Sequence, residues 1–280
     1  MSNEVVFTSG SSLKEFSGDL VLVGHGKMGD ALLEGWIDNG LKPSNVVVFD
    51  PARKFDEAVR QVHRINPENP GIATAIVLAV KPQIASNVLG ALSRAVGTDT
   101  LVLSVMAGQT LSFLEHRLPA ETAIVRAMPN MPAAIRRGIT VAISNARVSL
   151  PQRELARRLL ASVGFVEWID DESLMDAVTA VSGSGPAYVF LLAESLTRAG
   201  IAAGLPPDLA AKLARETVAG SGELLHRSAL DPATLRQNVT SPGGTTAAAL
   251  EILMAAADGL DPLLAKAIAA AAKRSRELAG

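Results

Sequence analysis

The sequence predicts a two-part α/β protein: a Rossmann-like N-terminal domain with a doubly wound, mostly parallel sheet, then an all-α C-terminal domain. Up to about residue 170, short Val-, Ile- and Leu-rich runs alternate with segments of helical periodicity, as in parallel sheets with crossover helices. From Glu172 onward no strand pattern remains, and several segments are apolar around most of their circumference. We therefore expect a loose tail over 1–18, the sheet domain over 19–170 and the helical domain over 171–280.

The apolar runs and the Gly and Pro stops between them set the expected elements. Strands are expected at residues 19–23, 45–50, 73–80, 100–107, 123–127, 139–143 and 165–169. Helices of the first domain are expected at 30–40, 83–96, 111–118 and 151–163, and those of the second at 172–181, 186–204, 206–226, 232–237, 244–258 and 261–278. Because helices that are apolar on several sides must be covered, we expect the second domain to form a homodimer.

Composition narrows the function classes. The chain has 280 residues, a formal net charge of −2 and no basic run, so nucleic acid is not an expected partner. It has no cysteine and its four histidines are scattered without ligand spacing, so we expect no disulfide, no cysteine nucleophile and no metal. The first 18 residues do not read as a signal peptide, and no uninterrupted apolar run has membrane-span length. We expect a soluble, cytoplasmic protein without a membrane partner.

A glycine-rich turn follows the first expected strand. Gly24-x-Gly26-x-x-Gly29 opens a helix, and the next strand ends in Asp50, 26 residues after Gly24. This order is the one that a dinucleotide-binding βαβ unit needs, because the helix N-terminus offers unpaired N–H groups to a pyrophosphate. The alternative is a purely structural turn. The candidate cofactor-binding residues of this turn are Gly24, His25, Gly26, Lys27, Met28 and Gly29.

The choice of dinucleotide stays open. An acid such as Asp50 normally accepts hydrogen bonds from the ribose of NAD and repels the 2′-phosphate of NADP. Pro51 and Arg53 follow directly, and with Lys54 the arginine could receive that phosphate. Two further strand ends should face the cofactor, unless they are simple strand stops. They are Ala79, Val80, Lys81 and Pro82, and Met106, Ala107 and Gly108.

Two more small-residue turns lie in the second domain. Ser241-Pro242-Gly243-Gly244-Thr245-Thr246 precedes an Ala-rich helix, so its N–H groups suit a carboxylate; the alternative is an ordinary helix start capped by Ser241. Ser182-Gly183-Ser184-Gly185 separates two helices, just before the single tyrosine, Tyr188. It is either a packing turn or a floor under the nicotinamide and the substrate.

Five stretches together resemble the pyrroline-5-carboxylate reductase family. They are Gly24-His-Gly-Lys-Met-Gly29, Ala79-Val-Lys-Pro82, Arg126-Ala-Met-Pro-Asn-Met-Pro132, the run from Asp176 to Phe190, and Ser241-Pro-Gly-Gly-Thr-Thr246. The resemblance extends from about Leu20 to the C-terminus, and its last two stretches are specific. It implies hydride transfer from NAD(P)H to the C=N bond of 1-pyrroline-5-carboxylate, giving L-proline in the last step of proline biosynthesis.

The resemblance also implies roles for residues. The cofactor would be held by three stretches that follow expected strands: Gly24 to Gly29, Ala79 to Pro82 and Met106 to Gly108. Substrate would bind at Ser241, Gly243, Gly244, Thr245 and Thr246, with Glu172, Ser182, Gly183 and, on the cofactor side, Asn238 lining the same pocket. Family members interlock their helical domains as dimers around this pocket, and larger rings of dimers occur. Lys27 and Asp50 depart from the family, which often has Asn and a neutral residue there, so NADP preference does not carry over.

Simple chemistry agrees with this interpretation. A protonated imine accepts hydride readily, so the enzyme mostly needs to align the reactants. Thr246 is the candidate catalytic residue, as a hydrogen-bond partner of the ring nitrogen, while water or prior protonation in solution could supply the proton. Three alternatives stay open: reduction of another cyclic imino acid, a β-hydroxyacid-dehydrogenase-like enzyme, and a non-catalytic dinucleotide-binding protein. The second would need a lysine shortly after Gly185, and the sequence has none there.

Overall fold

The computed structural model describes residues 12–50, 60–62 and 73–279. These residues form two compact units. The sheet unit comprises the described residues up to Gly183 together with the C-terminal turns from Arg274, and the helical unit comprises Ser184–Lys273.

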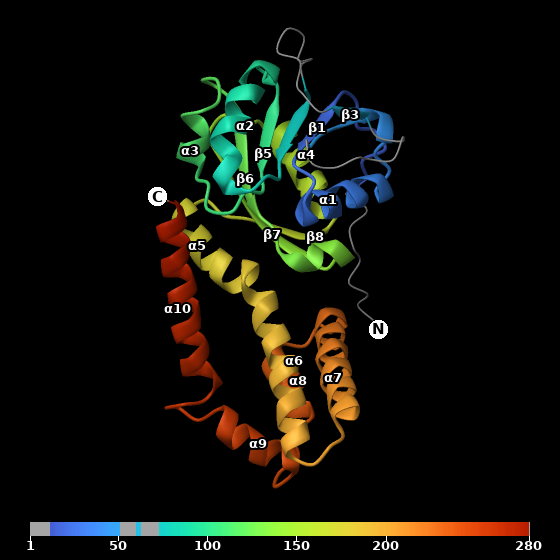
Figure 1. The fold of residues 1–280 in the computed structure, drawn as a ribbon, viewed down its shortest axis with the longest axis vertical. Helices are drawn as coiled ribbons and strands as arrows, with labels where there is room; N and C mark the ends of the chain where they lie inside the picture. Colours follow the sequence, from blue (N-terminus) through green and yellow to red (C-terminus); the bar gives the residue numbers. More distant parts are fainter. Residues whose placement is uncertain (1–11, 51–59, 63–72, 280) are drawn as a thin grey trace. The chain divides into compact units, whose positions relative to one another are not determined.

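The sheet unit is built on one eight-stranded sheet in the order β3-β2-β1-β4-β5-β6-β7-β8 (Figure 1). The strands are β1 Leu20–Val23, β2 Val46–Phe49, β3 Arg60–Val62, β4 Ala75–Leu78, β5 Leu101–Ser104, β6 Ala123–Met128, β7 Gly138–Ser144 and β8 Gly164–Trp168. All neighbouring strands are parallel except β6 and β7, which confirms the doubly wound, mostly parallel sheet. The order reverses between β1 and β4, where such folds bind ligands at the carboxyl ends.

Helices cover both faces of this sheet. They are α1 Lys27–Asp38, α2 Ala85–Leu92, α3 Leu111–Glu115 and α4 Leu150–Ala161. Helix α4 begins with a capping box, in which Ser149 and Gln152 satisfy each other's backbone N–H groups. Alternate strand residues point to opposite faces. Leu20 and Leu22 of β1 therefore join a core with α1 and α4, whereas Val23 joins a second core with α2 and α3.

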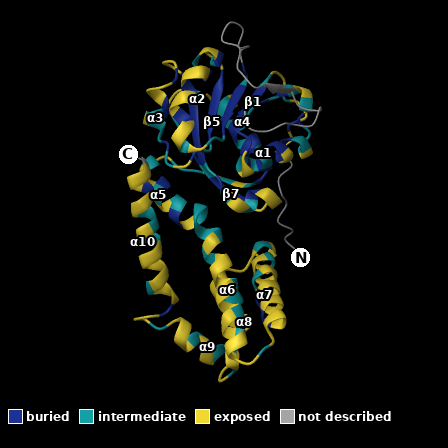
Figure 2. Ribbon diagram, viewed as in Figure 1, coloured by how far each residue is buried: buried dark blue, intermediate teal, exposed yellow. Residues whose placement is uncertain are grey.

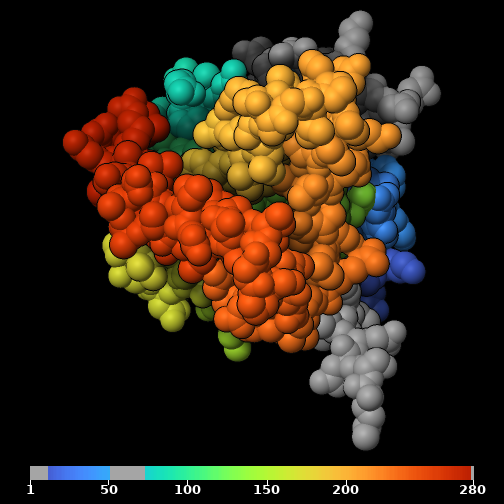
Figure 3. All heavy atoms as spheres, turned by 90° about the horizontal axis from the view of Figure 1, so that it is seen from below, coloured from blue at the N-terminus to red at the C-terminus, as the bar shows by residue number. Residues whose placement is uncertain are grey.

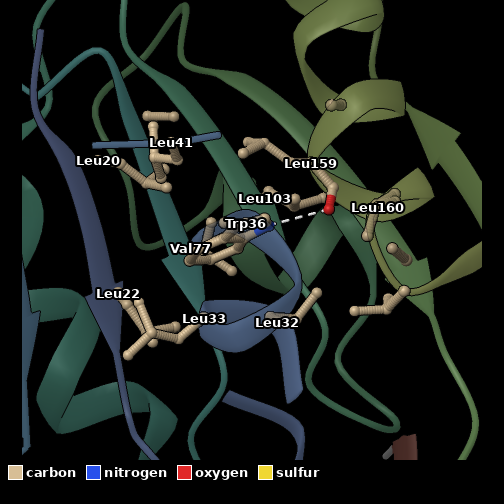
Figure 4. Close-up of a cluster of buried hydrophobic side chains, with 14 of the residues drawn as sticks. Leu20, Leu22, Leu32, Leu33, Trp36, Leu41, Val77, Leu103, Leu159 and Leu160 are labelled. Carbon is tan, nitrogen blue, oxygen red and sulfur yellow. Dashed lines mark hydrogen bonds between the residues drawn. The ribbon is translucent and has the colours of Figure 1, made fainter. Parts of the chain in front are cut away.

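Trp36 is at the centre of the first core. Its side chain is 0% exposed and its indole Nε1 donates to the Leu159 carbonyl oxygen at 2.9 Å, which ties α1 to α4 (Figure 4). Buried residues are concentrated in the strands and the inner helix faces of this unit (Figure 2). The sheet unit therefore encloses its own hydrophobic core on both faces.

Two segments of the sheet unit differ from expectation. Within the segment expected to be a loose tail, Leu13 is buried in the first core and its N–H donates to the Asn39 carbonyl oxygen at 2.9 Å. The helix expected at 172–181 is instead three short pieces: a 3₁₀ turn Glu172–Leu174, α5 Met175–Val178 and a π-helix Thr179–Gly183. The strand β3 was not predicted, because its three residues are too few to give a pattern.

The helical unit contains α6 Gly185–Ala202, α7 Pro207–Arg227, α8 Pro232–Asn238, α9 Thr245–Leu253 and most of α10 Leu260–Ala279. Helix α9 is shorter than the expected 244–258, because the chain turns at 254–259 and the Gly259 N–H donates to the Ala255 carbonyl oxygen at 2.9 Å. Helices α6 and α7 pack closely where Gly200 approaches Ala210.

The helical unit has almost no buried core. Among residues 184–273, all of which the structure describes, Ala210 and Ala214 are the only buried hydrophobic side chains, and yellow, exposed residues dominate α6–α10 in Figure 2. Figure 3 shows the side chains of α6 to α9, coloured gold to orange-red, in space-filling form. Large apolar residues are among the exposed ones. Examples are Phe190, Leu191, Leu192, Leu213, Leu224, Ile252 and Leu263.

Candidate active site

The glycine-rich turn joins β1 to α1. At two of its positions, Gly24 and Gly29, the backbone leaves no room for a side chain. Gly24 has φ +90°, and a Cβ there would lie 2.8 Å from the Ala79 carbonyl oxygen. A Cβ on Gly29 would collide with the Gly24 carbonyl oxygen. The Gly24 N–H also donates to the Phe49 carbonyl oxygen at 2.9 Å. Because of these contacts, the first turn of α1 packs closely against the ends of β1, β2 and β4.

Gly26 is glycine for a different reason. It is the N-cap of α1, it is exposed, and a Cβ placed on it would meet no atom within 4 Å. The space in front of the helix N-terminus is therefore left open by the protein. An anion can approach the backbone N–H groups there, so these residues fit the pyrophosphate of a dinucleotide.

Asp50 makes a structural contact that the sequence did not reveal. Its Oδ2 accepts a hydrogen bond from the His25 N–H at 2.7 Å, so the end of β2 holds the glycine-rich turn in place. The His25 ring is buried and its Nε2 lies 3.1 Å from Asp30 Oδ1. His25 is thus packed between the turn and α1. Pro51 and Arg53, which we expect to contact the cofactor, lie outside the described residues.

The ends of β4 and β5 lie beside this turn. The Ala79 N–H donates to the Val23 carbonyl oxygen at 2.8 Å, and the Val105 N–H donates to that of Leu78 at 3.0 Å. Lys81 is exposed just before Pro82, and Ala107 is exposed next to Gly108, which has φ +73°. The Met106 side chain is instead buried in the second core. From Met106, only the backbone can therefore face a ligand.

A cavity of about 360 Å³ opens beside the first turn of α1. It is lined by Lys27, Met28, Asp30, Ala31, Pro129, Asn130, Met131, Ala134 and Gly183. The structure thus brings three sequence-predicted residues, Lys27, Met28 and Gly183, to one cavity. Its opposite wall, the connection from β6 to β7, carries no predicted site residue. The only sequence signal for that wall is the stretch from Met128 to Pro132, which carries the family resemblance but no assigned role.

Asn130 connects this wall to the turn at Ser182. Its Oδ1 accepts from the Ile139 N–H at 3.0 Å, and its Nδ2 donates to the Ser182 carbonyl oxygen at 3.4 Å. Ser182 Oγ is buried and has no hydrogen-bond partner among the described residues. A Cβ on Gly183 would lie 2.6 Å from Met128 Cε, so the end of the Met128 side chain would have to move to admit one. Irregular π-helical turns such as this one are common at functional sites.

Glu172 lies in the sheet unit and is held by two donors. Its Oε1 accepts from Arg126 Nη1 at 2.6 Å and from the Leu111 N–H at 2.8 Å. Arg126 is 6% exposed, so this is a largely buried ion pair. The family resemblance implied that Glu172 lines the substrate pocket, but it indicated no partner for this side chain.

The turn at residues 241–246 belongs to the helical unit. Gly244 is the N-cap of α9 and no side chain caps the helix, so the alternative of a Ser241 cap is wrong. The Gly244 N–H donates to the Ser241 carbonyl oxygen at 3.0 Å, and Gly243 has φ +69°. Ser241, Gly243 and Thr245 are exposed, Thr246 is half-buried, and Asn238 is exposed at the end of α8. The N-terminus of α9 is therefore open to an anion.

The described residues show neither a metal cluster nor a membrane-spanning helix. Within residues 12–50, 60–62 and 73–279, no cluster of three or more His, Cys, Asp or Glu side chains is arranged to hold a metal ion. The helices described by the structure include none with the length and hydropathy that a membrane span requires.

Comparison with known proteins gives the class first. Residues 19–108 match the family model described as NADP oxidoreductase, coenzyme F420-dependent, so the sheet unit carries the dinucleotide-binding domain of an oxidoreductase. Residues 172–278 match the model of pyrroline-5-carboxylate reductase dimerisation.

Full-length relatives then give the family. The chain is 40% identical to pyrroline-5-carboxylate reductase of Pseudomonas aeruginosa over 93% of this chain and 96% of the relative, and 39% identical to that of Synechocystis over 92% and 97%. Among solved structures, a pyrroline-5-carboxylate reductase from Coxiella burnetii matches with TM-score 0.85 and 33% identity over 95% and 100% of the chains. The Plasmodium falciparum enzyme, solved with NADP bound, matches with TM-score 0.80 and 32% identity over 94% and 99%. The chain belongs to the pyrroline-5-carboxylate reductase family.

Proposed function

We propose that this chain reduces 1-pyrroline-5-carboxylate to L-proline with NAD(P)H, the last step of proline biosynthesis. The observation that carries the proposal is the full-length similarity to named reductases, one of which was solved with NADP bound. The reduced nicotinamide supplies the hydride when the cofactor is bound. The residues of this chain then have to bind the two reactants, align them and exclude competing reactions.

The sheet unit would hold the cofactor. The open N-terminus of α1 at Gly26 suits the pyrophosphate, and Asp50 lies at the end of β2, where ribose recognition takes place in this fold. The strand ends at Ala79, Val80, Lys81 and Pro82, and at Met106, Ala107 and Gly108, would border the nicotinamide half. Lys27, Met28 and Gly183 already line a cavity next to the phosphate turn.

The helical unit would hold the substrate carboxylate. The N–H groups from Gly243 to Thr246 open α9 without a side-chain cap, and they carry the positive end of the helix dipole. The Thr246 hydroxyl would hydrogen-bond the ring nitrogen and orient the C=N bond. An ordinary threonine hydroxyl is a poor acid, so the imine would be protonated by water or before it binds.

The exposed apolar face of the helical unit supports self-association. A second copy would cover residues such as Phe190, Leu192 and Leu213, and the matched family model is described as a dimerisation domain. We propose a homodimer through this unit. Rings of dimers, as the family resemblance implies, remain a further proposal.

The direct test mixes the protein with NADH or NADPH and 1-pyrroline-5-carboxylate, then follows loss of reduced nicotinamide absorbance and formation of proline. Oxidation of cofactor with proline as product is expected. Turnover only with the six-membered cyclic imine would favour another imino acid reductase. Binding of NADH without turnover of any imine would indicate a non-catalytic dinucleotide-binding protein.

Cofactor preference is tested at Asp50 with two variants. Asp50→Asn keeps an oxygen acceptor for the His25 N–H but removes the charge, whereas Asp50→Ser shortens the side chain and removes the observed hydrogen bond. If the charge selects NAD, Asp50→Asn should shift the kcat/KM ratio toward NADPH by about tenfold. If Asp50→Ser loses activity with both NADH and NADPH and Asp50→Asn does not, the main role of Asp50 is to anchor the glycine-rich turn through the His25 N–H.

A further inference from the structure

One carboxylate oxygen joins three segments that border the proposed site. Glu172 Oε1 accepts from Arg126 Nη1 at 2.6 Å and from the Leu111 N–H at 2.8 Å. All three residues belong to the sheet unit. They come from parts of the chain that are far apart in sequence. The carboxylate therefore holds three separate segments together in the tertiary structure, and its hydrogen bonds are not those of one local turn.

Each of these segments leads into a predicted site element. Leu111 is the first residue of α3, which Thr110 caps by accepting from the Phe113 N–H at 3.1 Å; residues 106–108 lie just before it. Arg126 pairs with Ser104 in the register of β5 and β6, and the chain continues to Pro129 and Asn130 in the cavity wall.

Glu172 itself begins the third segment. From there the chain runs through α5 and the π-helix to Ser182 and Gly183. Asn130 closes the far end of this path by donating to the Ser182 carbonyl oxygen. The segments from Arg126 to Asn130 and from Glu172 to Gly183 are therefore joined at both ends.

The ion pair between Arg126 and Glu172 strongly constrains the positions of the segments that carry it. Arg126 is almost fully buried, and a buried charge that loses its partner is strongly destabilising. Hydrogen bonds between ionised groups are shorter and stronger than neutral ones, and the guanidinium has a fixed planar geometry. Because Oε1 already accepts two hydrogen bonds, Glu172 is occupied with protein groups at this atom.

We infer that Arg126 and Glu172 are positioning residues for hydride transfer, resting on the proposed function. They hold residues 106–110 and 129–130 in register with the Ser182–Gly183 turn, and they act on the reaction only through those segments. This assigns Glu172 to support of the site in place of direct substrate contact. A small displacement of such segments is enough to lower the rate, because alignment is most of what this reaction needs.

The test compares Arg126→Met, Arg126→Lys, Glu172→Gln and the double variant Arg126→Met/Glu172→Gln. Glu172→Gln keeps an oxygen acceptor for the Leu111 N–H and loses the charge. Glu154→Gln is the matched control, because Glu154 also pairs with arginines but on the surface of α4. Steady-state kinetics with saturating NADH, NADH titrations and melting temperatures are measured for each.

The expected result is a split between kinetic constants. Arg126→Met should lower kcat by about tenfold or more and leave KM for NADH within about twofold, since the turn from Gly24 to Gly29, which would bind the pyrophosphate, takes no part in these hydrogen bonds. Arg126→Lys should recover part of the loss. The double variant should be no slower than the worse single variant, because the two residues act as one unit. Glu154→Gln should match wild type.

Three outcomes would overturn the inference: folded Glu172→Gln and Arg126→Met with wild-type kcat, losses that follow only the folded fraction, or additive losses in the double variant. If Arg126→Met does not fold, Glu172→Gln decides. If wild type reduces no imine, the proposed function fails on its own. The emission spectrum of bound NADH then tests the inference separately, with a shift expected in Glu172→Gln and an unchanged spectrum contradicting it.

Discussion

The sheet unit and the helical unit solve the problem of burying apolar surface in opposite ways. In the sheet unit, Leu20, Leu22, Trp36 and Val77 are fully buried, because helices cover both faces of the sheet. In the helical unit, where every residue is described, the buried hydrophobic residues are Ala210 and Ala214 alone. A layer of helices with apolar residues on several sides needs another layer to cover it. The first unit carries a complete core, and the second leaves most of its large apolar side chains exposed.

The two units also differ in the ligand that each is proposed to bind, the dinucleotide in the sheet unit and the imino acid in the helical unit. The open glycine-rich turn belongs to the unit with its own core, and the uncapped N-terminus of α9 belongs to the unit without one. Cofactor binding should therefore be insensitive to self-association, whereas substrate binding should depend on it. The variants below test this contrast, from the largest expected effect to the smallest.

Trp36→Ala should give the largest loss of stability. The side chain is fully buried and its indole satisfies the Leu159 carbonyl oxygen, so truncation leaves a cavity and an unpaired acceptor. We expect the free energy of unfolding to fall by about 3–5 kcal/mol, measured by circular dichroism in urea at fixed protein concentration.

Trp168→Ala is the matched control for this variant. Trp168 lies on the edge strand β8, with the Arg153 guanidinium 4.3 Å from its ring centre, and is only partly buried. Its truncation should destabilise the protein clearly less. Equal losses would mean that the core around Trp36 is not the main source of stability in the sheet unit.

Phe190→Gln should act on association. Phe190 is 55% exposed on α6, and covering a phenylalanine contributes about 1.5–3 kcal/mol. The dissociation constant of the dimer should therefore rise by about tenfold or more in a sedimentation dilution series. Leu150→Gln is the control, because Leu150 is 83% exposed on the sheet unit. A larger effect from Leu150 would move the interface away from the helical unit.

Gly26→Ala should weaken NADH binding by about tenfold or more without a change in melting temperature, because its Cβ would enter space that the protein leaves empty and a phosphate needs. Gly90→Ala in α2 is the matched control, since a Cβ there also meets nothing within 4 Å. NADH fluorescence titration measures both. Wild-type affinity in Gly26→Ala would remove the turn from the cofactor site.

The smallest effect is expected for a surface ion pair. Hydrogen bonds from Arg157 and Arg158 lower the pKa of Glu154 from 4.5 to about 2. Because the folded protein favours the carboxylate, this stabilisation is present above pH 4.5 and is lost as the pH falls toward 2. Glu154→Gln should cost less than about 1 kcal/mol at neutral pH, and the difference from wild type should shrink in acid.

Glu194→Gln on α6 is the counterpart in the helical unit, where Glu194 pairs with Arg198 at 3.4 Å. It should cost still less, because both side chains are mostly exposed. Unfolding curves at several pH values compare the two. A pH-independent difference between Glu154→Gln and wild type would contradict the electrostatic origin of the effect.

Periodicity predicted the architecture well. The Val- and Ile-rich runs identified seven of the strands, and Gly24, Gly26 and Gly29 predicted the glycine-rich turn between β1 and α1, because both signals are local in sequence. The strand β3 has only three residues, Arg60–Val62, and it begins with two polar ones. So short a segment shows no alternation of apolar and polar residues. The break at Thr179 into a π-helix also left no sequence signal, since Asp176 to Val181 has ordinary helical composition.

The site was predicted less completely, because several of its contacts are tertiary. The hydrogen bond from His25 to Asp50 requires the register of β1 and β2. The bonds of Asn130 to Ile139 and Ser182 depend on how the β6–β7 connection meets the π-helix. Residue types alone could not identify these partners. The cavity wall from Pro129 to Ala134 was missed for the same reason.

The most direct test of the division of labour between the two units is the kinetic effect of Thr246→Ala. If the N-terminus of α9 binds the imino acid and the sheet unit binds the dinucleotide, the variant should raise KM for 1-pyrroline-5-carboxylate or lower kcat by about tenfold or more, the equivalent of one lost hydrogen bond. Its dissociation constant for NADH should stay at the wild-type value. Unchanged imine kinetics, or an equal loss of NADH affinity, would show that this turn does not bind the substrate.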